Sequence, residues 1–146
     1  MTIAVPINTF SIVAHCPRTN MLGVGVASKY LAVGAVCSHT QAGVGAVSTQ
    51  AYGNPYLGVD SLALLQQGLT AQKTLARVLK QDPGREKRQL LMVNNRGEVA
   101  AFTGSLTTPW CGHIQGEGFV VAGNMLAEET VIKAMADAFE QSEEEE

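Results

Sequence analysis

Three pairs of side chains have the chemistry of metal ligands, or of a nucleophile beside its base. Each cysteine has a histidine within two positions: His15 with Cys16, Cys37 with His39, and Cys111 with His113. Thiolate and imidazole are ligands of tetrahedral zinc, and the Cys111 and His113 pair also suits nucleophilic catalysis. However, successive strand residues point to opposite faces, so His15 and Cys16 cannot bind one ion from a regular strand. The sequence also lacks a C-x-x-C motif. We therefore expect isolated thiols and loop histidines, with no metal and no cofactor.

Glycine-rich segments raise a second possibility, phosphate binding by a glycine-rich turn. Gly23-Val-Gly25 and Gly43-Val-Gly45 each contain part of a dinucleotide-binding fingerprint. Neither has the third glycine before a helix, or the acidic residue about 20 positions further on, that the fingerprint requires. Close packing of two sheets explains these glycines better, because strands with small residues let a second sheet approach.

The elements that would position these groups begin with short runs of valine, alanine and glycine. Such runs, bounded by turn residues, are typical of buried strands. Residues 17–20 supply a proline and an asparagine between the first two runs, so we expect a β-hairpin there. An Asn- and Gly-rich turn at residues 94–97 predicts a second hairpin. The predicted strands are 9–14, 22–28, 42–50, 88–93, 98–102 and 118–124.

Capping residues and apolar periodicity predict three helices. Asp60 or Ser61 caps the first, which stops at Gly68, and Thr70 caps the second. The third begins at Glu128, since acidic residues suit the positive end of a helix dipole. Residues 141–146 then form a disordered acidic tail, because like charges repel near the negative end of that dipole. This order of elements predicts sheets covered by helices rather than a doubly wound parallel fold.

Composition limits the partners and the location of the protein. The chain has 146 residues, a formal net charge of -3 and no basic cluster, so we expect no nucleic-acid partner. No apolar run reaches the roughly 18 residues of a membrane-spanning helix, and the first residues lack a basic segment. Three widely spaced cysteines do not resemble a disulfide framework. We therefore expect one cytoplasmic domain with reduced thiols and no membrane partner.

Seven short blocks then match a known family in content and in order. They are TFSIVA, GVGVAS, AVGA, AGVGAVSTQAYGNP, DPGREKRQ, AAFTGS and AGNML. With these blocks, from Thr9 to about Phe139, the chain resembles the bacterial family known as domain of unknown function 1028. The resemblance implies an α+β fold, a four-layer αββα sandwich similar to that of N-terminal-nucleophile (Ntn) hydrolases, the group of the proteasome β subunits. It implies no settled activity.

The chain departs from the family pattern in four places. Cys16 stands where the family usually has aspartate, and Asn20 where it usually has glycine. We expect residues 1–8 to form a leader and the domain to span residues 9–140. Family members also generally continue beyond the last helix. Three explanations fit this difference. The chain is a fragment, a cleavage product, or a short member whose second sheet is completed by another chain. Since exposed strand edges invite association, we expect a homo-oligomer.

The resemblance implies a catalytic residue at the start of the first strand. An Ntn hydrolase uses the side chain of its first residue as nucleophile and that residue's α-amine, with a pKa of about 8, as base. Thr9 is the candidate once the Asn8–Thr9 bond is cut, and Thr2 is a second candidate. The alternative for Thr9 is a β-branched strand residue without a chemical role.

Catalysis by such an enzyme also needs donors aimed at a developing oxyanion. The resemblance places these donors in the turn at residues 51–54 and at Asn124, so Asn54 and Asn124 join Thr9 as catalytic candidates. We assign substrate binding to Gly53, Ser28 and His39. Turn formation is an equally good explanation of the asparagine and glycine in this turn. We expect one pocket, at one end of the sheets and crossed by the leader, to be lined by Thr9, Gly53, Asn54 and Asn124.

The sequence-based function is hydrolysis of a C–N bond in a small polar substrate, with Thr9 as latent nucleophile. The alternative is a non-catalytic protein of the same fold, either a small-molecule-binding module or an oligomeric scaffold. A fold by itself does not name a substrate, so the substrate stays open at this point.

Overall fold

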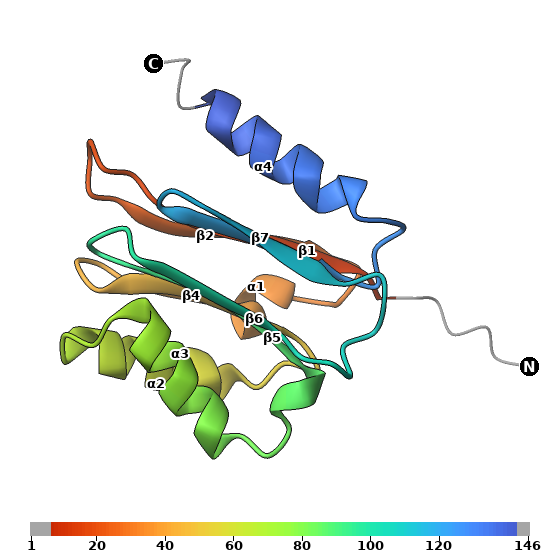
Figure 1. The fold of residues 1–146 in the computed structure, drawn as a ribbon, viewed down its shortest axis with the longest axis horizontal. Coiled ribbons are helices and arrows are strands. Elements are labelled where there is room, and N and C mark those ends of the chain that lie inside the picture. The colour runs from red at the N-terminus through yellow and green to blue at the C-terminus, as the bar shows by residue number, and fades with distance from the viewer. Residues whose placement is uncertain (1–6, 143–146) are drawn as a thin grey trace, which may run out of the picture.

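The computed structural model describes residues 7–142, which form two four-stranded antiparallel sheets and four α-helices (Figure 1). In the first sheet the strand order is β2 (Leu22–Ser28), β1 (Thr9–His15), β8 (Phe119–Asn124) and β7 (Gly112–Gly116). In the second it is β3 (Ser38–Gln41), β4 (Gly45–Ala51), β5 (Arg88–Asn94) and β6 (Val99–Thr103). The helices are α1 (Val33–Cys37), α2 (Pro55–Gln66), α3 (Ala71–Gln81) and α4 (Thr130–Ser142), with a 3₁₀ turn at Arg85–Lys87.

The predicted β1–β2 hairpin is confirmed. The two strands pair along their whole length, from Thr9 opposite Ser28 to His15 opposite Leu22. Asn20 takes a left-handed φ of 58° in the turn, a conformation that asparagine tolerates better than most residues. Backbone bonds between Cys16 and Met21 and between Asn20 and Cys16 close the turn.

Two helix starts differ from the predicted ones. Helix α2 begins at Pro55 rather than near Asp60, because the Asn54 side chain caps it by accepting a bond from the Tyr56 N–H, and proline is favoured at the first helical position. The start of α4 is Thr130 rather than Glu128. The cap of α3 is as predicted, since the Thr70 hydroxyl accepts from the Lys73 N–H.

The strand predicted at 42–50 starts three residues late, and three short elements were not predicted. Gly43 has a φ of 71° and the Val44 N–H bonds to Gln41, so these residues turn between β3 and β4. The segments α1, β3 and β7 have four or five residues each, too few to show a period. Helix α4 continues to Ser142, two residues into the predicted tail. The predictions for Thr2, for the first six leader residues and for the last four glutamates lie outside the described residues.

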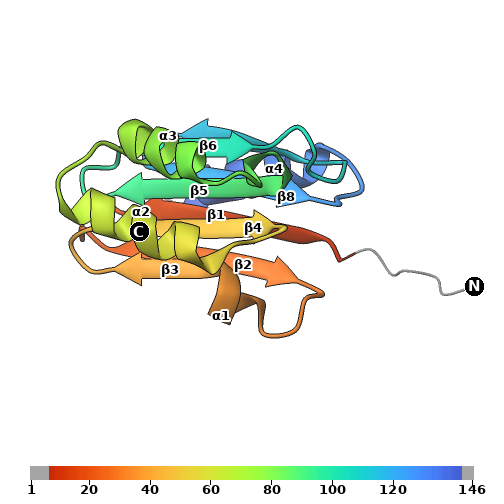
Figure 2. The same ribbon diagram turned by 90° about the horizontal axis from the view of Figure 1, so that it is seen from below.

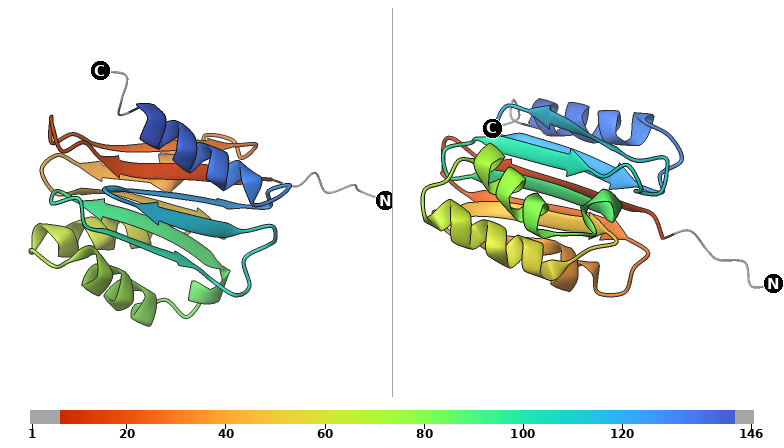
Figure 3. Two further views of the ribbon diagram at one scale, coloured as in Figure 1. Left: turned by 45° about the horizontal axis from the view of Figure 1, so that its top comes forward. Right: turned by 60° about the horizontal axis from the view of Figure 1, so that its bottom comes forward.

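Helices cover the outer face of each sheet (Figures 1 and 2). Helices α2 and α3 pack on the second sheet around Val47, Leu90 and Met92. Helix α4 packs on the first sheet around Phe119, Val121 and Ile132, and Figure 3 shows it lying across those strands. The order of layers is therefore α4, first sheet, second sheet, then α2 with α3. Among residues 7–142, no helix is both long and apolar enough to span a bilayer.

The layer between the two sheets changes character from one end to the other. At one end it is apolar, built from Val13, Val120, Ala122, Ala46, Leu91 and Val93. At the other end the same strands bury polar side chains, namely Thr9, Ser11, Gln50, Gln89 and Asn124. Buried polar groups without partners are costly, so this polar end must satisfy them internally or with a ligand. The candidate site lies at this end.

Candidate functional site

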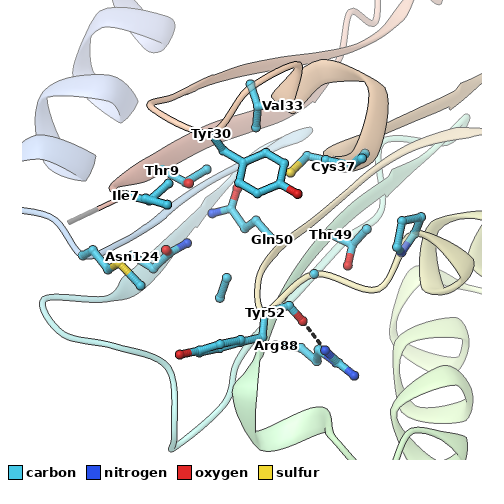
Figure 4. Close-up of a pocket in the computed structure, with 15 residues that line it drawn as sticks. Ile7, Thr9, Tyr30, Val33, Cys37, Thr49, Gln50, Tyr52, Arg88 and Asn124 are labelled. Carbon is cyan, nitrogen blue, oxygen red and sulfur yellow. Dashed lines mark hydrogen bonds between the residues drawn. The ribbon is translucent and has the colours of Figure 1, made fainter. Parts of the chain in front are cut away.

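A cavity of about 670 Å³ opens at the polar end of the sheets, where β1 begins and β4 and β8 end (Figure 4). Loops after β2 and β4 and helix α1 supply the remaining walls. The lining residues are Ile7, Thr9, Tyr30, Val33, Val36, Cys37, Thr49, Gln50, Ala51, Tyr52, Gly53, Pro55, Arg88, Asn124 and Met125. A cavity of this size accommodates a small organic molecule.

Thr9 and Asn124 lie opposite each other in the β1–β8 pair, and both line the cavity. Directly opposed residues of antiparallel strands have Cβ atoms roughly 5 Å apart and point to the same face. Thr9 is buried because β1 alternates, with Thr9, Ser11 and Val13 facing the second sheet. The structure thus brings together two residues that the sequence separates widely.

The Thr9 hydroxyl is held by Ser28. Their oxygen atoms are 2.9 Å apart, and Ser28 Oγ donates to the Asn8 carbonyl oxygen at 3.0 Å. A hydroxyl has one hydrogen, so Ser28 must accept from Thr9 while it donates to Asn8. The Tyr30 N–H also donates to Ser28 Oγ, at 3.0 Å. Ser28 thereby fixes both the Thr9 hydroxyl and the carbonyl of the Asn8–Thr9 peptide bond. It does not itself line the cavity.

Asn124 belongs to a buried amide network that joins the two sheets. Its Nδ2 donates to Gln89 Oε1 at 3.2 Å, and Gln50 Nε2 donates to the same oxygen at 2.6 Å. Ser11 donates to Gln50 Oε1 at 2.7 Å. The Gln89 Nε2 group, with two hydrogens, lies 2.9–3.0 Å from three acceptors, namely Thr103 Oγ1 and the carbonyl oxygens of Gly112 and Gly123 in the first sheet. These bonds fix the orientation of Asn124 beneath the cavity.

Sequence reasoning missed Gln50 and Gln89. Both are buried, Gln50 after Thr49 near the end of β4 and Gln89 after Arg88 at the start of β5. The available signal was the alternation of side chains in a strand, which places Gln89 on the same face as Leu91 and Val93, and therefore inside. A long amide at such a position predicts a partner across the layer.

Among the described residues that line the cavity, Arg88 is the one cationic residue, and its charge is matched by Asp82. Its Nε lies 2.9 Å from Asp82 Oδ2, and it also donates to the Tyr52 carbonyl. The hydrogen bond from Arg88 lowers the pKa of Asp82 below its usual value, with the Gly84 N–H adding to the effect. The ion pair anchors the loop after β4, which carries Tyr52 and Gly53.

The other predicted site residues have separate positions. Gly53 lines the cavity, whereas Asn54 caps α2 and is not among the lining residues. His39 packs against Gly58 of α2 and its Nε2 is 3.4 Å from the Val36 carbonyl oxygen, so its ring is also outside the lining. Of the four residues predicted to meet, the cavity collects Thr9, Gly53 and Asn124.

The cysteines and histidines do not converge. Cys37 is buried in the cavity wall, and burial raises the pKa of its thiol. His113 bonds to Thr103 at 2.9 Å and His15 to Asn20 at 2.7 Å, in different parts of the first sheet. Within residues 7–142, no three His, Cys, Asp or Glu side chains are grouped to hold a metal ion.

The backbone is strained on two sides of the cavity. Ala51 follows Gln50 with a φ of 67°, and Met125 follows Asn124 with a φ of 54°. Left-handed conformations at residues other than glycine cost on the order of 1 kcal/mol or more and concentrate at functional sites. Here they turn the chain sharply at the ends of β4 and β8, next to Gln50 and Asn124.

A family model and a solved structure relate this chain to known proteins. No curated protein matches the chain. A crystal structure of a Silicibacter pomeroyi protein, described as belonging to the DUF1028 family model, superposes with a TM-score of 0.87 at 34% identity. The match covers 90% of this chain and 59% of that one, so this chain spans less than two thirds of its structural neighbour. The family described as "Family of unknown function (DUF1028)" matches residues 9–146. The chain therefore belongs to the DUF1028 family.

Proposed function

We propose that this protein hydrolyses a C–N bond of a small molecule by the chemistry of an Ntn hydrolase, with Thr9 as nucleophile. The observation that carries the proposal is the position of Thr9, at the start of β1, in the cavity wall and opposite Asn124. The packing of helices outside two stacked sheets is consistent with the four-layer sandwich that the proposal requires.

Thr9 becomes reactive when its α-amine is free. That amine, with a pKa of about 8, takes the hydroxyl proton as Oγ1 attacks the substrate carbonyl. The substrate nitrogen leaves with a proton, an ester forms on Thr9, and water hydrolyses the ester. Ser28 already accepts from Thr9 and holds the Asn8 carbonyl, so it anchors the bond whose cleavage frees the amine.

Asn124 is the side chain proposed to stabilise the oxyanion. An amide group has two N–H donors and one carbonyl acceptor, and one donor of Asn124 is engaged by Gln89. In the proposed mechanism the second donor binds the oxyanion, because Asn124 lines the cavity directly opposite Thr9, whose Oγ1 attacks the substrate carbonyl. Asn54 receives a different role in this proposal. By capping α2 it fixes the position of the Gly53 backbone in the cavity wall.

The test compares three proteins: the 146-residue chain, the chain produced to begin at Thr9, and that shorter chain with Thr9→Ala. A β-lactone that acylates N-terminal hydroxyls is added, and intact mass with peptide mapping locates the adduct. We expect labelling of Thr9 in the second protein alone, together with turnover of acyl p-nitroanilides. Absence of both label and turnover when Thr9 is the first residue would overturn the proposal, provided that circular dichroism shows a folded chain.

A second function is favoured by the residues that precede Thr9. Ile7 lines the cavity and Asn8 is bonded to Ser28, so in this form the Thr9 amine is part of a peptide bond. A non-catalytic small-molecule-binding protein needs no free amine. This alternative predicts that the 146-residue chain binds a ligand and that the chain beginning at Thr9 shows no turnover.

A further inference from the structure

We propose that the ligand of this cavity carries an uncharged aromatic group, bound between Tyr30 and Tyr52, with its polar bond directed at Thr9 and Asn124. The inference deepens the proposed function by naming the acyl side of its substrate. It also changes the sequence-based expectation of a small polar substrate, since only the bond to be cut is polar.

The cavity is divided into a polar floor and apolar walls. Thr9, Gln50 and Asn124 come from the ends of strands and are buried. The walls come from α1, from the start of α2 and from the chain after β8, through Val33, Val36, Pro55 and Met125. An apolar group gains from leaving water against such walls, by roughly 25 cal/mol per Å². A ligand that fits both parts has one amide-like bond attached to an apolar body.

Two exposed aromatic rings flank the entrance. Tyr30 follows β2 and is 53% exposed, and Tyr52 follows β4 and is 57% exposed. In Figure 4 the two rings lie on opposite sides of Gln50 and Asn124. Aromatic pairs contribute roughly 0.5–1.5 kcal/mol beyond burial, so rings left in water beside a cavity favour an aromatic ligand.

The backbone that carries each ring is fixed. The Tyr30 N–H donates to Ser28 Oγ, the group that also holds Thr9. The Tyr52 N–H donates to the Lys87 carbonyl, and its own carbonyl accepts from Arg88. A ligand therefore has to order only the two side chains and not the loops that carry them, which reduces the ordering cost of binding.

Charge excludes ionic ligands from the same space. Asp82 compensates Arg88, the cationic residue of the lining, through the ion pair described above. No aspartate or glutamate is among the described residues that line the cavity. While Thr9 is still joined to Asn8, a charged group moved into the cavity would lose hydration and meet only an arginine already paired with Asp82, which is unfavourable. A neutral group is therefore preferred.

The test measures binding alone, so it does not depend on turnover. The 146-residue chain is titrated with 3-phenylpropanamide, propanamide and 3-phenylpropanoate, and binding is followed by two-dimensional NMR. We expect the aromatic amide to bind at least about tenfold more tightly than the other two. Tyr30→Ala and Tyr52→Ala should each weaken its binding about two- to tenfold, whereas Tyr30→Phe and Tyr52→Phe retain it.

Tyr56→Ala is the matched control. Tyr56 is 74% exposed but is not among the cavity residues, so its loss should leave binding unchanged. Equal binding of propanamide, tighter binding of the carboxylate, or insensitivity to both tyrosine-to-alanine changes overturns the inference. If the aromatic amide binds as expected but the chain beginning at Thr9 cleaves no anilide, the proposed function fails and this inference stands. If that chain cleaves acetyl and phenylpropanoyl anilides equally, the aromatic preference fails and the proposed function stands.

Discussion

Thr9 and Asn124 occupy directly opposed positions on β1 and β8, at the start of one strand and the end of the other. Both side chains point between the sheets, because each strand alternates and its other face packs on α4. Ser28 lies opposite Thr9 on β2, the other strand that pairs with β1. Thr9 therefore has a hydroxyl on one side and an amide on the other, both held by further hydrogen bonds.

The first prediction concerns Asn124. In the chain that begins at Thr9, Asn124→Ala should lower kcat by about 100-fold or more with little change in KM, since the lost donor acts on the transition state. Steady-state kinetics on an acyl anilide measure this. Asn95→Ala is the control, because it removes an exposed amide that is bonded to the Gly43 carbonyl, just after the end of β5 opposite to Arg88. An unchanged kcat for Asn124→Ala would remove Asn124 from the mechanism.

The second prediction concerns the buried amide Gln89. Gln89→Leu leaves Gln50, Asn124 and two backbone carbonyls short of partners inside the protein. We expect the free energy of unfolding to fall by roughly 2–4 kcal/mol, measured by urea denaturation. Gln72→Leu removes a single exposed bond to the Val99 carbonyl and should cost less than about 1 kcal/mol. Equal effects of the two substitutions would contradict the proposed importance of the network.

The third prediction concerns the contact between His39 and Gly58. A Cβ added at Gly58 would collide with the His39 ring, so Gly58→Ala should destabilise the protein by about 1–3 kcal/mol. In a His39→Ala background the collision is absent, and alanine should then stabilise α2 by up to about 1 kcal/mol through its helix propensity. Chemical denaturation of the four proteins of this cycle gives both values. The same sign in both backgrounds would show that the ring does not occupy this space.

The fourth prediction concerns the pH dependence of stability. Burial lowers the pKa of His113, so the folded protein disfavours the imidazolium form. The unfolded chain takes up a proton near its ordinary pKa of about 6.5, so the contribution of His113 is present above that pH. It is lost as the pH falls through the lower pKa of the folded protein.

Urea midpoints at about pH 7.5 and about pH 5 should therefore differ less in His113→Asn than in the unaltered protein. Asparagine can keep the bond to Thr103 that His113 Nδ1 makes at 2.9 Å. His15→Asn is the control for loss of an exposed imidazole. An identical pH dependence in the protein and in His113→Asn would show that His113 does not contribute.

Several parts of this fold followed from local sequence alone. The β1–β2 hairpin is encoded by two apolar runs and an asparagine that accepts a left-handed turn. The Thr70 cap fixes the start of α3 because one hydroxyl suffices to satisfy a free N–H. The ordered family blocks identified the family, which the match over residues 9–146 confirms. Such features need only a few neighbouring residues.

Tertiary structure decided what surrounds the cavity. Sequence named Thr9 and Asn124, but their opposition depends on β1 and β8 pairing across most of the chain. Asn54 had the right chemistry for a site, and a local hydrogen bond to Tyr56 committed it to a helix cap instead. Strand alternation indicated that Gln89 is buried, but it did not name the partners of Gln89, and nothing local singled out Tyr30 or Tyr52. Burial, long-range hydrogen bonds and the exposure of a ring are set by distant segments that pack together, so only the folded chain reveals them.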